Sequence, residues 1–379
     1  MSIPESPRSL PLLRAMVDAA DRDLLQAIAR RMALVSEIGT LKRSLGLRIR
    51  DPRREQEVLD DRLREAEGLG LPRAELESIF RVLLRASRDH QAMMRVEVTP
   101  EERTRTIAII GGKGRMGSLL ARLFADLGHQ VLVTDVDTEL RAAGAAAASD
   151  VVVVSVPIER TEGVIAEVGP HVREDGLLMD VTSVKRGPVE AMLASTRASV
   201  VGTHPMFGPN VHTVQGQRVV LCRARGEAWA EWVAHTLSSH GMVVTEATAE
   251  HHDRVMSVVQ VLTHFQTQVM GLTLSRLGVP LEETLRFTSP VYLLELYTTA
   301  RHFAQAPELY GSIEMRNPRS AEVTGTLREV ATVLADVIAR RDQVAFTALF
   351  EEVRAFFGPF TTEALEQSKY LIDRIVERG

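Results

Sequence analysis

The sequence predicts an α and α/β multidomain chain, in which an all-helical N-terminal region precedes an open parallel sheet and a second, mostly helical region. Three patterns support this prediction. Over residues 10–45, apolar residues recur at steps of three and four, which is the period of an α-helix. Residues 106–135 combine an apolar run, a glycine-rich turn, a helical pattern and a second apolar run, as a strand–helix–strand unit does. From about residue 246 the helical period returns.

The composition excludes several classes of protein. A chain of 379 residues has room for two or three domains. Its 45 basic and 50 acidic residues are nearly balanced, so we expect no nucleic-acid or anionic-membrane partner. Cys222 is the single cysteine, which rules out an intrachain disulfide and fits a cytoplasmic protein. We find no N-terminal signal pattern and no apolar run of bilayer length, and therefore expect no membrane span.

The N-terminal region predicts three helices. The first covers about 36 residues, which is long for an isolated globular helix, so its apolar stripe must be buried against a partner. Gly46 ends this helix. Asp51 and Pro52 then form an N-cap with proline at the first helical position, and a second helix follows. After a glycine-containing break, Pro72 opens the third helix.

The polar residues of these helices have an informative spacing. Arg31 and Lys42 are eleven residues apart and therefore share a helix face. Arg14 lies seventeen residues before Arg31, too far along the axis for the same small site, although it could serve the site of a partner in an antiparallel dimer. Ser87 and Gln91 are four residues apart and face together. A charge on a helix usually faces solvent, so the spacing alone leaves that alternative open.

Three segments of this region, LLRAMVDAADRDLLQAIARRMALVSEIGTLK, RIRDPRREQEVL and SRDHQ, together resemble the all-helical chorismate mutase domain over residues 8–95. The resemblance implies an intertwined homodimer in which each site takes one arginine, Arg14, from the neighbouring chain. It implies that Arg14 and Arg31 hold the two carboxylates of chorismate, and that Lys42 and Gln91 bind its ether oxygen. The remaining positions that it assigns to substrate binding are Asp51, Arg54, Glu55 and Ser87.

The glycine-rich turn predicts a Rossmann-type domain that binds NAD. Gly112, Gly114 and Gly117 form the pattern G-x-G-x-x-G between a strand and a helix. Such glycines permit a sharp turn, close approach of a pyrophosphate, and tight packing of helix on sheet. The N-terminus of the helix can bind the phosphates. Asp135 ends the second strand, where a carboxylate accepts the ribose hydroxyls, which favours NAD over NADP.

Further strand ends follow along the chain. Residues 151–154 are all valine, as in a parallel strand buried on both faces. Ser155 follows this run, Ser183 and Lys185 follow the next predicted strand, and His204 follows a third. Since cofactors lie at the carboxyl ends of parallel strands, we expect these groups to converge there. The predicted cofactor-binding residues are Gly112, Gly114, Arg115, Met116, Gly117, Asp135, Ser155 and Pro157.

A second resemblance is to prephenate dehydrogenase, carried by MDVTSVKRGPVEAML, VGTHPMFGPN and SPVYLLELYTTARHFAQAPELYGSI. It implies NAD-dependent oxidative decarboxylation of prephenate to 4-hydroxyphenylpyruvate. It also implies that His204 is the catalytic histidine, that Ser183 orients either His204 or the substrate, and that Arg301 binds a substrate carboxylate. Lys185 is a second candidate for carboxylate binding, and His264 matches a position near the substrate pocket. With the mutase region in front, the chain is similar throughout to the bifunctional family of tyrosine biosynthesis.

The expected domains are a chorismate mutase domain at 1–95, a linker at 96–105, a Rossmann NAD-binding domain at 106–205, and a C-terminal, mostly helical substrate-binding and dimerisation domain at 206–379. A preference for arogenate over prephenate remains open, as does a catalytically silent mutase-like domain. The triplet His251-His252-Asp253 invites a metal site, but no second cluster of ligands follows it, so we expect no metal. Leu293 stands where close bifunctional relatives have arginine, which puts inhibition by tyrosine in doubt.

Overall fold

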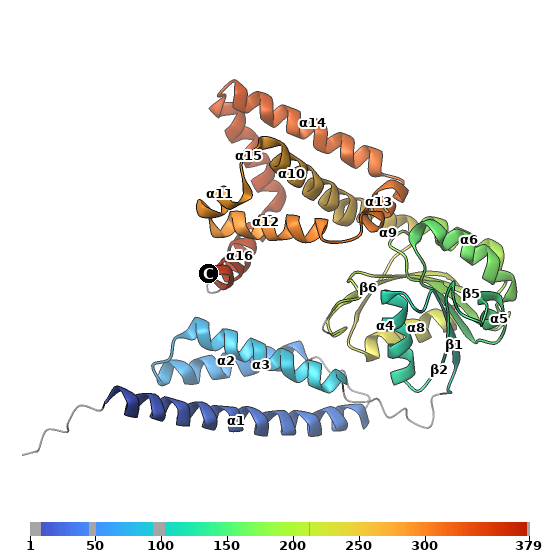
Figure 1. The fold of residues 1–379 in the computed structure, drawn as a ribbon, viewed down its shortest axis with the longest axis horizontal. Coiled ribbons are helices and arrows are strands. Elements are labelled where there is room, and N and C mark those ends of the chain that lie inside the picture. Colours follow the sequence, from blue (N-terminus) through green and yellow to red (C-terminus); the bar gives the residue numbers. More distant parts are fainter. Residues whose placement is uncertain (1–8, 45–50, 94–102, 212, 377–379) are drawn as a thin grey trace, which may run out of the picture.

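The computed structural model describes residues 9–44, 51–93, 103–211 and 213–376. Its first three helices are α1 (Leu10–Ser44), α2 (Pro52–Gly68) and α3 (Arg73–Met93), and α3 packs against both of the others (Figure 1). Asp51 caps α2 by accepting a hydrogen bond from the amide of Arg54 at 3.0 Å. The three predicted helices and this cap are therefore confirmed, whereas Gly46, the predicted end of the first helix, lies outside the described residues.

The core of this helical unit is small and lies mainly between α2 and α3. Leu59 and Leu63 are each only 3% exposed. Arg88 on α3 donates to Glu55 on α2 at 2.8 Å, and both side chains are largely shielded from solvent. Much of the apolar stripe of α1 remains exposed, including Val17 and Leu41. Although α3 packs against α1, the single chain therefore leaves much of the apolar stripe of α1 exposed.

The central part of the chain forms one seven-stranded sheet in the order β2-β1-β3-β4-β5-β6-β7. All neighbouring strands are parallel except β5 and β6, which are antiparallel. The strands are β1 (Thr106–Ile110), β2 (Gln130–Thr134), β3 (Val151–Val154), β4 (Leu177–Asp180), β5 (Ser199–Pro205), β6 (Arg218–Arg225) and β7 (Val243–Glu246). Because β6 and β7 continue the sheet, the domain extends to about residue 246, beyond the expected boundary at 205.

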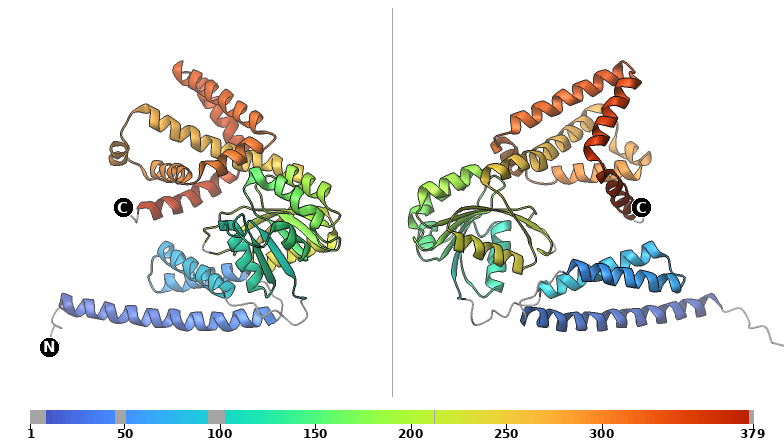
Figure 2. Two further views of the ribbon diagram at one scale, coloured as in Figure 1. Left: turned by 45° about the vertical axis from the view of Figure 1, so that its right-hand side comes forward. Right: turned by 180° about the vertical axis from the view of Figure 1, so that it is seen from behind.

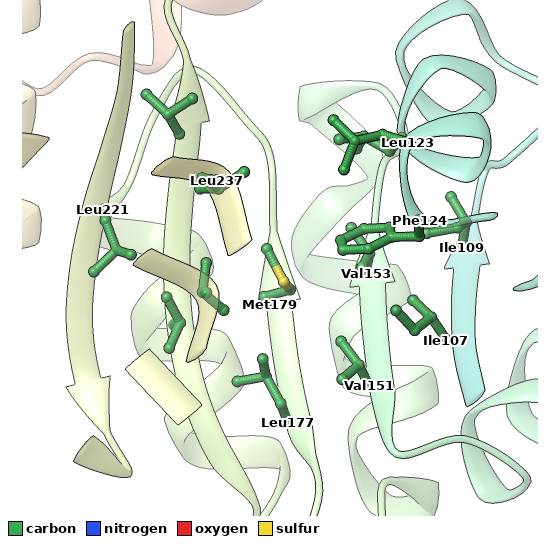
Figure 3. Packing of buried hydrophobic residues seen from close by; sticks show 14 of the residues in the cluster. Ile107, Ile109, Leu123, Phe124, Val151, Val153, Leu177, Met179, Leu221 and Leu237 are labelled. Atoms are coloured by element: carbon green, nitrogen blue, oxygen red, sulfur yellow. The ribbon is translucent and has the colours of Figure 1, made fainter. Parts of the chain in front are cut away.

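Helices cover both faces of the sheet (Figure 1). They are α4 (Arg115–Asp126), α5 (Ala142–Ala147), α6 (Ile158–Val168), the short η1 (Gly169–His171), α7 (Arg186–Ser195) and α8 (Glu227–Ser239). On one face Leu123 and Phe124 of α4 pack against Ile109 and Val153 of the strands (Figure 3). On the other face α5, α6 and α7 bury their apolar residues. Burial on both faces explains why β3 is an unbroken run of valine.

The C-terminal region is helical, as expected. It comprises α9 (Ala249–Met256), η2 (Ser257–Leu262), α10 (Thr263–Leu277), α11 (Leu281–Arg286), α12 (Pro290–Phe303), α13 (Pro307–Arg316), α14 (Ser320–Ala339), α15 (Gln343–Phe357) and α16 (Phe360–Val376). These helices gather on one side of the sheet domain (Figure 2). The segments α9, η2 and α10 follow one another without a break, and η2 is a π-helix. Such segments are frequent at functional sites. Among the described helices, none is both long and apolar enough to cross a membrane.

A buried ion pair joins the ends of β4 and β5. The side chain of Lys185 is fully enclosed, and its ammonium group donates to the carboxylate of Asp180 and, at 2.7 Å, to the carbonyl oxygen of Thr203. The hydroxyl of Thr182 donates to the same carboxylate oxygen. This corrects the expectation that Lys185 binds substrate, because its ammonium group has no exposed surface and is already occupied by these two oxygens.

Replacing Lys185 by methionine should destabilise the protein strongly. The substitution preserves much of the side-chain volume but leaves the Asp180 carboxylate buried without its cation, and breaking such a pair costs about 3–5 kcal/mol. Thermal unfolding of Lys185→Met would measure the loss. Arg186→Met is the matched control, since Arg186 is the next residue, is exposed and pairs only with Glu190 among its described ion-pair partners. Equal unfolding midpoints for the two variants would contradict the structural role of Lys185.

Candidate active sites

The glycine-rich turn after β1 has no room for side chains. A Cβ atom on Gly117 would lie 2.3 Å from the carbonyl oxygen of Gly111, and one on Gly112 would lie 2.7 Å from Val133 Cγ1. Gly111 itself has φ of +81°, and a Cβ there would lie 2.4 Å from the carbonyl oxygen of Ser155. The glycine that the turn needs for its backbone conformation is therefore Gly111, just before the predicted motif. Gly112 and Gly117 are buried, whereas Gly114 at the start of α4 is exposed.

The groups around this turn fit a dinucleotide. Among the described residues, no side chain caps the N-terminus of α4 at Gly114, so the first amides of the helix remain for an anion. Asp135 follows β2 and is partly buried, and its carboxylate accepts the amide of Lys113 at 3.0 Å and that of Val136 at 2.9 Å. These bonds fix the carboxylate beside the turn, where ribose hydroxyls would lie.

The other predicted cofactor residues lie near the same edge of the sheet or at the start of a helix. Arg115 is exposed and Met116 is partly buried, and both belong to the first turn of α4. Ser155 follows β3, is partly buried, and donates its amide to the carbonyl oxygen of Ile110 at 2.8 Å. Pro157 is the exposed N-cap of α6.

His204 lies near the end of β5 and is only 2% exposed. Its Nδ1 lies 2.8 Å from Nε2 of His252, and its Nε2 lies 3.3 Å from the side-chain nitrogen of Gln260. Burial holds the pKa of His204 well below its ordinary value of 6.5, and the nearby charges of His252 and Lys185 lower it further. The ring is therefore a neutral base with an acceptor nitrogen at neutral pH.

Ser183, which was expected to orient either His204 or the substrate, lies partly buried in the turn after β4. In this structure Nδ1 of His204 contacts the ring of His252. Sequence reasoning missed His252, Asp253 and Gln260 as parts of this site. The triplet that begins with His251 was the available signal, but it was considered only as a metal site.

A second group of rings comes from α10, α12 and α13. His264 follows Gln260 by one turn, and its ring meets that of Tyr310 edge to face with centroids 4.8 Å apart. Tyr310 also stacks on His302 at 3.7 Å. Burial lowers the pKa of His264 to about 4, helped by the charge of His302. Among the described atoms, Nδ1 of His264 is buried without a hydrogen-bond partner. Arg301 is exposed on α12, next to His302 in sequence.

In the N-terminal helices, two of the predicted polar residues meet directly. Arg31 on α1 donates to the hydroxyl of Ser87 on α3 at 2.5 Å and to the carbonyl oxygen of Leu83 at 3.3 Å. Gln91 lies one turn beyond Ser87 and is 8% exposed. Among the described atoms, its side-chain oxygen is buried without a partner. These residues form the buried part of a polar site between α1 and α3.

The remaining predicted residues surround this part less tightly. Lys42 is partly buried near the end of α1, and Glu55 is held by Arg88. Arg54 is exposed and lies 3.5 Å from Glu57. Asp51 is exposed and serves as the cap of α2. Arg14 is exposed near the beginning of α1.

Comparison with known families divides the chain into three parts, which correspond to the N-terminal helices, the sheet domain and the C-terminal helices. The family model described as chorismate mutase type II matches residues 13–92. The model of the prephenate dehydrogenase nucleotide-binding domain matches residues 117–246, and that of the prephenate dehydrogenase dimerization domain matches residues 248–352. The second match ends with β7, in agreement with the extent of the sheet.

Solved structures share the fold of the dehydrogenase part. A prephenate dehydrogenase from Aquifex aeolicus, solved with hydroxyphenyl propionate and NAD+, superposes with a TM-score of 0.55 at 20% identity, covering 67% of this chain and 98% of the other. An arogenate dehydrogenase from Synechocystis gives 0.52 at 16% identity, covering 66% and 98%. At this level of identity the comparison establishes the fold.

Two relatives match almost the full length of the chain. The T-protein of Haemophilus influenzae is 34% identical over 362 residues, which is 96% of each chain. The T-protein of Enterobacter agglomerans is 34% identical over 363 residues, which is 96% of this chain and 97% of the other. The chain therefore belongs to the T-protein family, and it joins a chorismate mutase to a prephenate dehydrogenase in one enzyme of tyrosine biosynthesis.

Proposed function

We propose that α1 to α3 rearrange chorismate to prephenate, and that His204 and the glycine-rich turn at the carboxyl edge of the sheet then support oxidation of prephenate with NAD. The observation that supports the dehydrogenase half is the buried ring of His204, whose lowered pKa keeps it neutral and whose Nε2 faces the side-chain nitrogen of Gln260. The glycine turn, the uncapped start of α4 and the carboxylate of Asp135 support NAD as the cofactor.

The mutase reaction needs no nucleophile or proton carrier. One C–O bond breaks and one C–C bond forms within the same molecule, so catalysis consists of folding the dianion and stabilising the charge that develops on the ether oxygen. Arg31 would leave its contacts with Ser87 to bind a carboxylate. Lys42 and the amide nitrogen of Gln91 would donate to the ether oxygen. The unpaired, buried oxygen of Gln91 supports a role facing a ligand.

The dehydrogenase reaction needs an acceptor at the ring hydroxyl. The glycine-rich turn and Asp135 would hold NAD, which would supply the hydride acceptor for the carbon that carries this hydroxyl. The electron pair of the bond to the departing carboxylate stays in the ring, which becomes aromatic as carbon dioxide leaves. The hydroxyl shares its proton with Nε2 of His204 while the hydride departs and recovers it in the phenol product, so the positive charge on His204 is transient.

The carboxylates of prephenate require cations or donors other than Lys185. Arg301, on α12, could pair with one carboxylate in a bidentate geometry. His264 and Tyr310, whose rings lie together one helical turn beyond Gln260, would contact the substrate on the same side. Ser183, in the turn after β4, would contact the substrate hydroxyl or the cofactor.

We further propose that the enzyme works as a cytoplasmic homodimer. The exposed apolar stripe of α1 and the position of Arg14 support a partner chain that covers α1 and receives this arginine. The C-terminal region also has an apolar groove of about 660 Å³ between α14 and α15, with Phe346 and Phe350 among its lining residues. The cytoplasmic location is supported by Cys222, a buried thiol whose pKa is raised by burial to about 12, so it stays protonated and unreactive.

Two single substitutions should separate the two activities. His204→Asn should form prephenate from chorismate normally but lower kcat of the dehydrogenase about 10²–10⁴-fold, because the acceptor at the hydroxyl is lost. Lys42→Ala should oxidise supplied prephenate normally but lower the mutase rate at least about 100-fold. Absorbance of NADH and loss of chorismate would be followed in one preparation. A wild-type enzyme that oxidises prephenate and ignores chorismate would contradict the mutase half.

The pH dependence of the dehydrogenase should reflect the lowered pKa of His204. The histidine accepts a proton only when neutral, and its folded-state pKa lies well below 6.5. The value of kcat/KM for prephenate should therefore stay level as the pH falls through 6.5 and decrease only at lower pH. A midpoint of the acid limb at or above 6.5 would contradict this assignment. The residual activity of His204→Asn should lack the same limb.

Gly117→Ala should weaken NAD binding. Its Cβ would lie 2.3 Å from the carbonyl oxygen of Gly111, so α4 would have to move away from the turn. We expect KM for NAD to rise at least about tenfold, equivalent to about 1.4 kcal/mol, while the mutase rate is unchanged. Gly163→Ala is the matched control, because Gly163 also lies in a helix and a Cβ there would meet nothing within 4 Å. Equal KM values for the two variants would contradict the tight packing.

A further inference from the structure

His252 and Asp253 at the start of the long helix are both buried, with exposed fractions of 1% and 3%. They form a chain of hydrogen bonds that ends at His204. Nδ1 of His252 lies 2.8 Å from Oδ1 of Asp253, and Nε2 of His252 lies 2.8 Å from Nδ1 of His204. A buried carboxylate, an imidazole and a second imidazole in this order resemble the base-orienting arrangement of a catalytic triad, extended by one ring.

The carboxylate of Asp253 is held in its charged form. Oδ1 accepts the amide of Lys185 at 2.8 Å, and Oδ2 accepts the amide of Arg186 at 3.0 Å, at the N-terminus of α7. Burial raises the pKa of Asp253, but hydrogen bonds from His252, Arg186 and Lys185 outweigh it, so that the pKa lies below its ordinary value of 3.8. Asn317 also donates to the backbone oxygen of Asp253 at 2.8 Å. The carboxylate is therefore held by amides at the start of α7, and the backbone of Asp253 is held by Asn317.

This arrangement determines where the protons of both rings lie. An ionised carboxylate only accepts hydrogen bonds, so Nδ1 of His252 carries a proton and its Nε2 is an acceptor. His204 must then carry its proton on Nδ1, which leaves Nε2 as the acceptor. The amide nitrogen of Gln260 faces this Nε2 at 3.3 Å, as a donor would. One assignment of tautomers is thus consistent with these three contacts.

We propose that His252 and Asp253 are positioning residues for the dehydrogenase reaction, which hold the proton of His204 on Nδ1 so that Nε2 can accept the substrate hydroxyl in place of the amide of Gln260. This rests on the proposed role of His204. While the hydroxyl shares its proton with His204, the imidazolium donates more strongly to His252, and Asp253 stabilises the charge through that ring. No atom is transferred to His252 or Asp253.

A packing role for His252 is the main alternative, and two substitutions distinguish it. His252→Gln places an amide oxygen where Nε2 lies and can still accept the proton of His204, whereas His252→Leu fills similar space without an acceptor. We expect kcat of His252→Leu to fall about 100-fold, while its KM for prephenate changes less than about threefold. We expect kcat of His252→Gln to be at least about tenfold higher than that of His252→Leu. Mutase activity in the same preparation reports that each variant is folded.

The neighbouring His251 provides the matched control. It is exposed on the same helix and bonds to Arg254 at 2.9 Å, so His251→Gln should leave kcat unchanged. A folded His252→Leu with normal kcat would overturn the proposal, and so would equal losses in the Leu and Gln variants. His204→Asn separates the two claims: if it remains fully active, the role of His204 fails, whereas if it is inactive and His252→Leu is active, only the positioning role fails.

A measurement on the unmodified enzyme covers the case in which His252→Leu does not fold. Nitrogen-15 spectra of the histidine-labelled protein distinguish the two neutral tautomers, and the signals of His204 are those absent from His204→Asn. We expect His204 to carry its proton on Nδ1 at neutral pH. A His204 protonated on Nε2 would overturn the proposal.

Discussion

Asp253 joins parts of the dehydrogenase that lie far apart in the sequence, and most of these contacts are made by its carboxylate. It accepts two amides from the start of α7, on the sheet side, while its backbone oxygen accepts the side chain of Asn317 at the end of α13. Through His252 it also reaches His204 on β5. A buried carboxylate lacking such donors would be very costly. The junction between sheet and helices and the orientation of the base therefore depend on the same few hydrogen bonds.

Elements with a strong local pattern were predictable from the sequence. The cap at Asp51 and the turn around Gly114 depend on residues a few positions apart, and both are found as expected. Strands β6 and β7 were missed because β6, with the sequence RVVLCRAR, has no clear alternation and forms through antiparallel pairing with β5. The domain boundary was therefore expected at residue 205, too early in the chain. Local periodicity does not show that a segment will pair with a strand elsewhere in the sheet.

The residues of the dehydrogenase site also divide into those that could be predicted from the sequence and those that could not. His204 could be proposed because it ends a strand beside a nucleotide crevice. The function of Lys185 could not be read from its position, since its partners are the carboxylate of Asp180 and a carbonyl on the next strand, and only the fold encloses all three. His252 similarly lies 48 residues from the ring that it contacts. The sequence alone does not show this contact, and a histidine beside an aspartate is also typical of a metal site or a helix surface.

The unbroken helix from α9 through η2 to α10 carries Asp253, Gln260 and His264 on one rigid support. A bend or a shift of register within this support would displace all three residues together, because a helix transmits rotation along its length. Changes to the preferred substrate should therefore arise more readily on the separate helices α12 and α13, which contribute His302 and Tyr310. The long helix therefore fixes the positions of three residues of the proposed site together, whereas α12 and α13 position His302 and Tyr310 separately.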